Sequence, residues 1–253
     1  MIADERSMGA NEVYESDRSL GEYLLFHYGS RNEQFPWPGG PVEALDFPRR
    51  SVVELIDLKS SVGRALDLGC AVGKSSFVLA GIADEVLGID YSKSFISAAQ
   101  SILKAGKLPY QYQEHGNCWK KAVAESKVSP ANLSFETGDA CELRDDLKPF
   151  DLVHAANLLC RLPDPLKLLR KLPDLILPGG QLILTTPFTW LEEFTPQEKW
   201  LDGEGSVNGL KDVLREGFDL ELEKNLPFLI REHRRKYQYT IAYGTRWRKK
   251  IRE

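Results

Sequence analysis

The chain has 253 residues, of which 42% are hydrophobic and 28% are charged, and its formal net charge is -4 at pH 7. This composition is typical of a soluble globular protein and excludes a disordered or fibrous chain, and the length suffices for one large α/β domain. A weakly negative protein is not attracted to nucleic acid by its net charge, so we expect no nucleic-acid partner. Basic residues do gather near the C-terminus.

The predicted elements begin in an N-terminal segment, residues 1–60. Within it, residues 16–28 have the polar start and the apolar spacing of a capped amphipathic helix, and a stretch rich in Pro, Gly and aromatic residues follows at 35–41. This segment lies outside the repeating pattern that comes after it. We therefore expect a helical lid or substrate segment at 1–60 and a core at 61–253, together forming one structural domain.

From residue 64 onward, short apolar runs alternate with helix-like segments, the pattern of a doubly wound, largely parallel sheet. The predicted strands are 64–68, 85–90, 132–138, 150–156 and 181–186, and the predicted helices are 74–80, 93–105 and 164–172. The connection 106–131 is too long for a turn, and we expect it to contain a helix of its own. After a helix from residue 210 to about 216, strands near 219–223 and 237–243 are expected to form an antiparallel edge.

The most specific motif is the turn after the first predicted strand. Gly69, Ala71 and Gly73 follow the strand and precede a helix, so the backbone can approach a ligand closely. A dinucleotide fingerprint needs glycines two and five positions after Gly69, where this chain has Ala71 and Lys74. A phosphate-binding P-loop needs four residues between its glycines, whereas three separate Gly69 from Gly73. The turn therefore favours a nucleoside cofactor over a nicotinamide dinucleotide or a nucleoside triphosphate.

The spacing D-x-G-x-(G/A)-x-G from Asp67 to Gly73 resembles that of class I methyltransferases, which use S-adenosylmethionine (SAM). In that superfamily the turn packs against the methionine end of SAM, an acid after the second strand binds the ribose, and a residue after the third strand holds adenine. Asp90 and Asp139 stand at the last two positions. The resemblance implies SAM as cofactor, S-adenosylhomocysteine as product and no metal. It also implies an α/β, Rossmann-like class I methyltransferase sheet, mostly parallel with an antiparallel edge strand, plus an N-terminal helical lid.

The cofactor-binding residues predicted in this way are Asp67, Gly69, Cys70, Ala71, Gly73, Asp90, Tyr91, Asp139, Ala140 and Asn157. Structural alternatives stay open for two of them. Asp67 could cap a helix or turn, and Asp90 could be the N-cap of the helix that begins after Tyr91 and Ser92.

Six segments spread along the chain carry a narrower resemblance: 14–17, 23–29, 44–48, 155–163, 187–193 and 229–233. They resemble the 4-mercaptohistidine (5-thiohistidine) N-methyltransferases of ovothiol biosynthesis, from about residue 12 to residue 248. The resemblance implies methyl transfer from SAM to the imidazole nitrogen nearer the side chain. In that family the domain is often fused to an iron-dependent sulfoxide synthase. The histidines of this chain lack the compact spacing of its iron ligands, so we expect methylation alone, alongside a separate sulfoxide synthase and a C–S lyase.

The acceptor residues are expected at the carboxyl edge of the sheet, where open α/β sheets bind ligands. A neutral imidazole nitrogen already has a lone pair near pH 7, so the enzyme must supply alignment more than a strong base. We assign Asn157, Tyr14 and Tyr23 to the reacting group, and we assign Arg161 or Arg231 to the substrate carboxylate, which a guanidinium binds with two parallel hydrogen bonds.

Further substrate-binding candidates are His27, Phe188 and Trp190. Ordinary packing is the alternative for Tyr23, His27 and Trp190, and a solvated charge run is the alternative for Arg231. Other functions stay open as well, because the cofactor motif does not identify the acceptor. They are a methyltransferase for another small amine, thiol or imidazole, a non-catalytic SAM-binding module, and, more remotely, a nicotinamide oxidoreductase.

The expected compartment is the cytoplasm. The apolar runs, such as 175–177, are far shorter than the roughly 20 residues that cross a bilayer, so we expect no membrane partner. The N-terminus is polar and lacks the features of a secretion signal. The four cysteines form no C-x-x-C pair, which favours reduced thiols over a zinc cluster or a disulfide framework.

Overall fold

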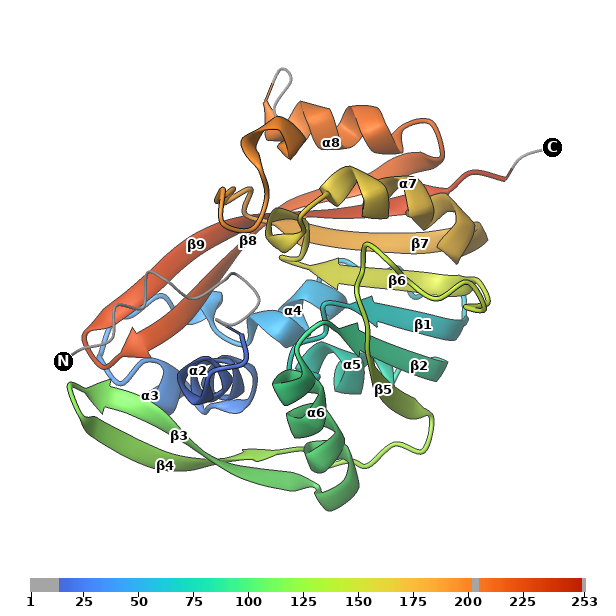
Figure 1. Ribbon diagram of the computed structural model, residues 1–253. Coiled ribbons are helices and arrows are strands. Elements are labelled where there is room, and N and C mark those ends of the chain that lie inside the picture. The colour runs from blue at the N-terminus through green and yellow to red at the C-terminus, as the bar shows by residue number, and fades with distance from the viewer. Residues whose placement is uncertain (1–13, 202–204, 252–253) are drawn as a thin grey trace.

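The computed structural model describes residues 14–201 and 205–251. Its centre is a seven-stranded sheet of order β5-β2-β1-β6-β7-β9-β8 (Figure 1). The strands are β1 (Val62–Leu68), β2 (Ala83–Asp90), β5 (Leu133–Thr137), β6 (Phe150–Ala156), β7 (Ile176–Thr186), β8 (Phe218–His233) and β9 (Lys236–Lys249). The neighbours from β5 to β7 pair in parallel, and β9 pairs antiparallel with both β7 and β8. The predicted fold class, a mostly parallel sheet with an antiparallel edge, is confirmed.

Helices cover both faces of the sheet. They are α2 (Asp17–Tyr28), α3 (Arg31–Gln34), α4 (Phe47–Val53), α5 (Lys74–Leu79), α6 (Lys93–Ala105), α7 (Pro165–Leu175) and α8 (Ser206–Leu214), with short 3-10 turns η2 (Val42–Ala44), η3 (Leu159–Arg161) and η4 (Gln197–Lys199). Side chains alternate between the two faces of each strand, so Ala65 belongs to the buried cluster that includes side chains of α4, α5 and α6, while Leu66 belongs to the one that includes side chains of α7 and α8. The predicted strands read as nearly continuous apolar runs because both faces are buried.

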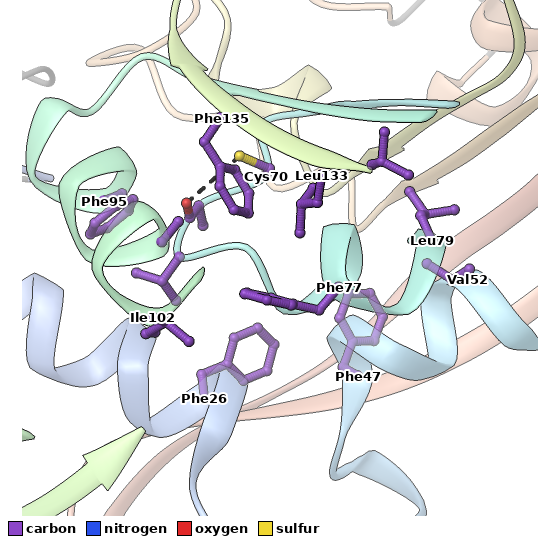
Figure 2. Close-up of a cluster of buried hydrophobic side chains, with 14 of the residues drawn as sticks. Phe26, Phe47, Val52, Cys70, Phe77, Leu79, Phe95, Ile102, Leu133 and Phe135 are labelled. Carbon is purple, nitrogen blue, oxygen red and sulfur yellow. Dashed lines mark hydrogen bonds between the residues drawn. The ribbon is translucent and has the colours of Figure 1, made fainter. Parts of the chain in front are cut away.

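The helix α2 belongs to the main core. Its Phe26 stacks on Phe47 of α4, with 6.1 Å between the ring centroids (Figure 2). Ser16 is the N-cap, and its side chain accepts a hydrogen bond from Ser19 N, as the capped helix predicted at 16–28 requires. The helices predicted at 74–80 and 93–105 are present with almost the same bounds, while α7 continues to Leu175 and α8 begins earlier than expected, at Ser206.

The connection 106–131 contains no helix, so that prediction was wrong. It forms an antiparallel hairpin of β3 (Lys107–His115) and β4 (Cys118–Glu125). Tyr110 and Tyr112 alternate with polar residues and are buried, and this period of two is typical of a strand. Gly116, with a φ of 47°, makes the turn between the strands. The length of the connection suggested a helix, but its alternation of buried and polar side chains is that of a strand.

The last two strands are much longer than predicted. β8 has 16 residues and β9 has 14. Only the second half of β9, from Tyr243 onward, pairs with β7, so the two strands continue beyond the sheet as a hairpin. In Figure 1 this hairpin and the β3–β4 hairpin lie on opposite sides of α2, which both contact.

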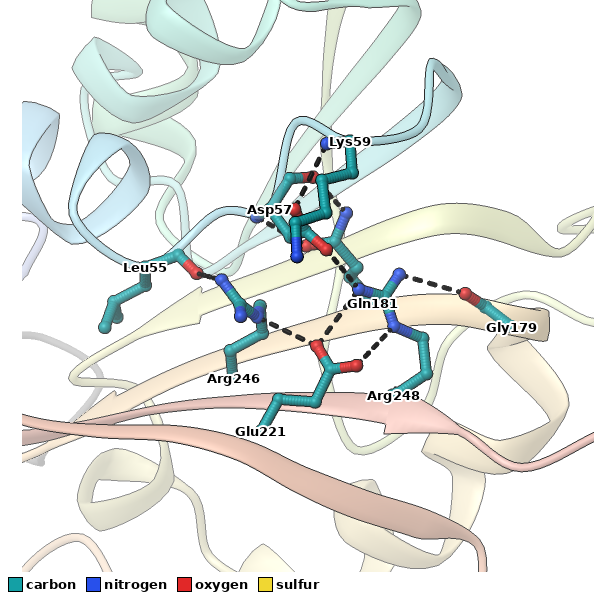
Figure 3. A network of polar contacts seen from close by, with 8 residues as sticks. All are labelled: Leu55, Asp57, Lys59, Gly179, Gln181, Glu221, Arg246 and Arg248. Atoms are coloured by element: carbon teal, nitrogen blue, oxygen red, sulfur yellow. Dashed lines mark hydrogen bonds and ion pairs between the residues drawn. The ribbon is translucent and has the colours of Figure 1, made fainter.

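The basic residues near the C-terminus are used within the fold. Arg248 pairs with Asp57 at 2.9 Å and with Glu221 at 2.9 Å, and Arg246 pairs with Glu221 at 2.9 Å (Figure 3). Nζ of Lys249 donates to the carbonyl oxygen of Ile176 at 2.6 Å. These contacts fasten β9 to β8, to β7 and to the segment before β1. In the part of the chain that the structure describes, no helix is long and apolar enough to cross a membrane.

Candidate functional site

A cavity of about 330 Å³ lies at the carboxyl ends of β1, β2 and β6, the edge at which open α/β sheets bind ligands. The turns after these strands and residues 138–140 form one part of its wall. α2, the start of α4, the loop after β7 and the β8–β9 hairpin form the other part. The predicted site residues that line the cavity are Tyr14, Tyr23, His27, Gly69, Ala71, Asp90, Tyr91, Asp139, Ala140, Asn157 and Arg161.

The turn after β1 has the backbone conformation that its glycines suggest. Gly69 and Gly73 have φ values of 68° and 87°, and Ala71 also lies in the left-handed region, at 48°. A Cβ atom on Gly69 would lie 2.9 Å from Cδ1 of Leu158, and one on Gly73 would lie 2.7 Å from the ring of Phe135. Gly69 and Ala71 line the cavity, whereas Gly73 and the buried Cys70 do not and serve the packing of the turn.

Asp67 lies beneath this turn and does not line the cavity. Ser75 Oγ and Ser76 Oγ donate to its Oδ2 at 2.7 and 2.6 Å, and Nδ1 of His154 lies 2.7 Å from its Oδ1. The other ring nitrogen of His154 lies 3.1 Å from Oγ of Ser51. Asp67 therefore fastens the start of α5 to β1 and β6. Its partners are side chains, and within the described residues no side-chain cap is present at the start of α5, so Asp67 is not the cap of that helix.

Asp90 connects the turn after β1 to the turn after β2. Its Oδ2 accepts a hydrogen bond from Ala71 N at 2.8 Å, and its Oδ1 accepts one from Ser92 N at 2.9 Å. Ser92 is the N-cap of α6, so the alternative in which Asp90 is that cap is wrong. Burial raises the pKa of Asp90 to about 6, although the two backbone N–H groups favour its charged form. A buried carboxylate at this edge still has lone pairs for hydroxyl donors.

Asp139, after β5, and Asn157, after β6, both line the cavity. Oδ1 of Asp139 accepts from Cys141 N at 2.7 Å, which fixes the turn after β5. Asn157 has a positive φ of 53°, and its Oδ1 accepts from the hydroxyl of Thr185 at 2.9 Å. The amide nitrogen of Asn157 is therefore the end that can donate to a ligand.

Aromatic rings dominate the rest of the cavity wall. The rings of Tyr14, Tyr23 and Phe95 contact one another, with centroid distances of 5.9 Å between Tyr14 and Tyr23, 4.7 Å between Tyr23 and Phe95, and 6.0 Å between Tyr14 and Phe95. Burial raises the pKa of both tyrosines, so their phenols are neutral near pH 7 and donate hydrogen bonds. His27 is also neutral, because burial lowers its pKa to about 3, and Lys74 N donates to its Nδ1 at 3.4 Å. Its remaining proton is on Nε2.

Arg161 is the one lysine or arginine among the described residues that line the cavity. One guanidinium nitrogen donates to the carbonyl oxygens of Cys160 and Thr189, both at 2.9 Å, and the group lies 4.9 Å from the ring centroid of Phe194. The phenol of Tyr14 lies near the charge of Arg161, which opposes the rise in the pKa of Tyr14, and both side chains contact the ring of Phe194. These contacts hold a permanent positive charge at the cavity wall.

Three predicted substrate residues lie elsewhere. Arg231 forms a buried ion pair with Glu114 of β3 and is held between the two hairpins. Phe188 stacks on Tyr243 at 5.9 Å. Trp190 donates to Oγ of Ser206 at 2.9 Å. None of the three lines the cavity, so the structure gives them packing roles. For Arg231 the sequence left a solvated charge run as the alternative, whereas the structure shows a buried ion pair.

Sequence patterns did not point to several residues that do line the cavity: Phe47, Pro48, Phe194, Phe228, Ile230, Gln238 and Thr240. Phe228 pairs with Thr240, and Ile230 pairs with Gln238, on the extended hairpin. Side chains alternate between the two faces of β8, so Phe228 and Ile230 lie on the same face. The sequence could have predicted this placement only if the full length of the strand had been known. Among residues 14–201 and 205–251, no group of three His, Cys, Asp or Glu side chains is placed to hold a metal ion.

Comparison with known proteins gives one matching family model, described as a methyltransferase domain, over residues 43–221. A ubiquinone biosynthesis O-methyltransferase from Coxiella burnetii is 28% identical over 175 residues, which cover 68% of this chain and 64% of that protein. This chain therefore spans less than two thirds of that relative's length.

Two solved structures share the fold. The N-methyltransferase NodS from Bradyrhizobium japonicum WM9, in complex with S-adenosyl-L-homocysteine, has a TM-score of 0.52 and 16% identity, and the alignment covers 91% of this chain and 98% of NodS. The [4+2]-cyclase SpnF has a TM-score of 0.61 and 14% identity, over 97% of this chain and 98% of SpnF. Since one neighbour is named a methyltransferase and the other a cyclase, the fold alone does not fix the reaction.

Proposed function

Because the chain belongs to the methyltransferase domain family, within the class I SAM-dependent superfamily, we propose that it methylates an imidazole nitrogen of 5-thiohistidine. The enzyme class and the cofactor SAM are those of the superfamily. The acceptor is the proposal. It rests on the narrower resemblance to the thiohistidine N-methyltransferases and on the chemistry of the cavity wall.

The part of the cavity that fits SAM contains Gly69, Ala71, Asp90, Asp139 and Asn157. The backbone of the turn after β1 would hold the methionine end, Asp90 would accept hydrogen bonds from the ribose hydroxyls, and Asp139 would accept one from the adenine amino group. When bound there, SAM supplies a methyl group on a positively charged sulfur. The left-handed Ala71 supports this fit, because strained backbone of this kind gathers at ligand sites.

The observation that carries the acceptor class is the charge of the other part of the cavity. Arg161 is its cation, and the two carboxylates of the lining, Asp90 and Asp139, both belong to the cofactor part. A small acceptor with a carboxylate is stabilised there, since a guanidinium binds a carboxylate with charge-assisted hydrogen bonds. The aromatic wall and the neutral donors Tyr14 and Tyr23 suit a planar heterocycle. These properties support an amino acid with an aromatic ring, as 5-thiohistidine is.

The protonation states favour transfer to nitrogen over transfer to oxygen. A hydroxyl acceptor must lose its proton to a base as it reacts, and among the described lining residues His27 is the one imidazole. With a pKa of about 3 and with Nδ1 occupied by Lys74 N, it is a poor base. A neutral imidazole nitrogen needs no base for attack. Its lone pair forms the N–C bond while the C–S pair returns to sulfur, and the ring proton leaves afterwards to solvent.

What the chain supplies in this proposal is alignment. Asn157 and the phenols of Tyr14 and Tyr23 would orient the ring, and Arg161 would fix the amino-acid end. Holding the nitrogen in line with the methyl group contributes roughly 7 kcal/mol or more in well-oriented systems. Residues 14–60 of the expected N-terminal segment supply Tyr14, Tyr23 and His27, which supports its role as the substrate segment beside the core. Residues 1–13 of that segment lie outside the described residues.

The deciding experiment is incubation of the chain with SAM and 5-thiohistidine, with histidine and unrelated phenols as competing acceptors. We expect a product from 5-thiohistidine that carries one added methyl group, located on nitrogen by NMR, and little from histidine or the phenols. No methylation of 5-thiohistidine, or faster methylation of a phenol, would contradict the proposed acceptor.

A further inference from the structure

Residues 14–16, here called the strap, connect the start of α2 to the start of α6. The carboxylate of Glu15 accepts hydrogen bonds from Lys93 N at 2.9 Å and from Ser94 N at 3.3 Å. The carbonyl oxygen of Tyr14 accepts from the hydroxyls of Ser94 at 3.1 Å and Ser92 at 3.3 Å. Four hydrogen bonds thus hold two residues of the strap on one helix end.

The reason for this contact is the N-terminus of α6. The first N–H groups of a helix have no partner within the helix, and a negative charge there is stabilised by the helix dipole. In α6, Phe95 N is bonded to the N-cap Ser92, while Lys93 N and Ser94 N are both bonded to Glu15. Glu15 therefore completes the cap of a helix that begins 78 residues later in the chain.

The other end of the contact is the cavity. The ring of Tyr14 lies 6.0 Å from the ring of Phe95, at the start of α6, and 5.8 Å from that of Phe194. Its phenol lies near the guanidinium of Arg161 in the loop after β6, because both side chains contact the ring of Phe194 and the charge of Arg161 acts on the pKa of Tyr14. The strap thus joins the loop after β2 to the loop after β6 across the cavity, and Tyr14 is the residue that touches both sides.

We propose that Glu15 is a positioning residue for the acceptor: its carboxylate fixes the strap on α6, and the fixed strap holds Tyr14 against the guanidinium of Arg161. Glu15 does not line the cavity, so it acts through Tyr14. Without the contact between Glu15 and α6, Tyr14 moves away from Arg161, and the guanidinium loses one of the groups that fix its orientation. The expected effect of Glu15 on acceptor binding rests on one part of the proposed function, namely that Arg161 binds the acceptor.

The kinetic test compares Glu15→Ala with Asp17→Ala, a matched control. Asp17 is an exposed acid two positions further along the chain, in the first turn of α2, and among the described residues no hydrogen bond or ion pair links it to α6. We expect Glu15→Ala to raise the KM for 5-thiohistidine about fivefold, the size of a lost helix cap, to lower the melting temperature by about 2–4 °C, and to leave the Kd for SAM nearly unchanged. Glu15→Gln, which keeps one acceptor oxygen, should restore part of the effect. If Glu15→Ala raises KM no more than Asp17→Ala does, the proposal is wrong.

A second test needs no acceptor, so it separates this proposal from the proposed function. In spectra of the chain labelled with ¹⁵N-arginine, Glu15→Ala and Tyr14→Phe should both shift the side-chain signal of Arg161, and the amide hydrogens of Lys93 and Ser94 should exchange several times faster in Glu15→Ala. Asp17→Ala should change neither. An Arg161 signal that responds to Tyr14→Phe but not to Glu15→Ala would overturn the positioning role, whether or not 5-thiohistidine is methylated.

Discussion

The cofactor part and the acceptor part of the cavity are built in different ways. The part proposed for the cofactor comes mainly from short turns that directly follow β1, β2 and β5, with contacts between them such as Ala71 N to Asp90, and it also includes Asn157 after β6. The acceptor part is assembled from α2, the loops after β6 and β7, and the β8–β9 hairpin, which are far apart in the chain. A local turn can keep one cofactor in place while the distant elements change, so the acceptor part is where related enzymes can diverge.

This difference explains what the sequence could predict. The positions of Gly69, Asp90 and Asp139 at the cavity follow from motifs a few residues long, because a strand end, a turn and a helix start are local structures. The residues Phe228 and Thr240 reach the cavity only because β8 and β9 pair beyond the sheet. The strand expected near 219–223 ends five positions before Phe228, so the extended part of the hairpin was missed.

Two residues show what local reasoning does not reveal inside a correct fold. Asp67 belongs to the glycine motif, yet His154, Ser75 and Ser76 take up its oxygens, and His154 comes from a strand 87 residues later. Arg231 lies in a charged run that looks solvated, yet Glu114 of the β3–β4 hairpin buries it in an ion pair. In both cases the partner comes from another element, and the sequence does not show which elements meet.

Asp90→Ala should have the largest effect that is specific to one part of the cavity, a loss of SAM affinity. It removes the acceptor of the ribose hydroxyls and leaves Ala71 N without its partner, so SAM should bind about 100-fold more weakly, which is about 2.7 kcal/mol. Titration calorimetry with SAM and S-adenosylhomocysteine measures this. Asp84→Ala, at an exposed position of the same strand, is the control and should bind normally. An Asp90→Ala protein that melts normally and binds SAM like the control would remove Asp90 from the cofactor site.

Arg161→Ala should affect the acceptor part alone. Loss of a charged hydrogen-bonding partner costs about 2 kcal/mol, so the KM for the acceptor should rise about 30-fold while the Kd for SAM changes little. Because one nitrogen of Arg161 also bonds the carbonyl oxygens of Cys160 and Thr189, the melting temperature must be measured in parallel. Arg161→Lys keeps the charge and should recover part of the affinity. Equal losses for SAM and acceptor would assign Arg161 a structural role in both parts.

The smallest effect that we expect for the cofactor part is a dependence of SAM affinity on pH. Burial raises the pKa of Asp90 to about 6, and its charged form is the better acceptor for hydroxyl groups. SAM affinity should therefore be constant well above pH 6 and fall as the pH drops through 6, by about tenfold at pH 5, because only the ionised fraction binds well. His27 adds nothing to this change, since its pKa of about 3 keeps it neutral throughout the range. Calorimetry between pH 5 and 8 should show proton release on binding near pH 6, and Asp90→Asn should abolish both the release and the pH dependence. A pH dependence that survives in Asp90→Asn would place the titrating group elsewhere and would break the assignment of Asp90 to the ribose.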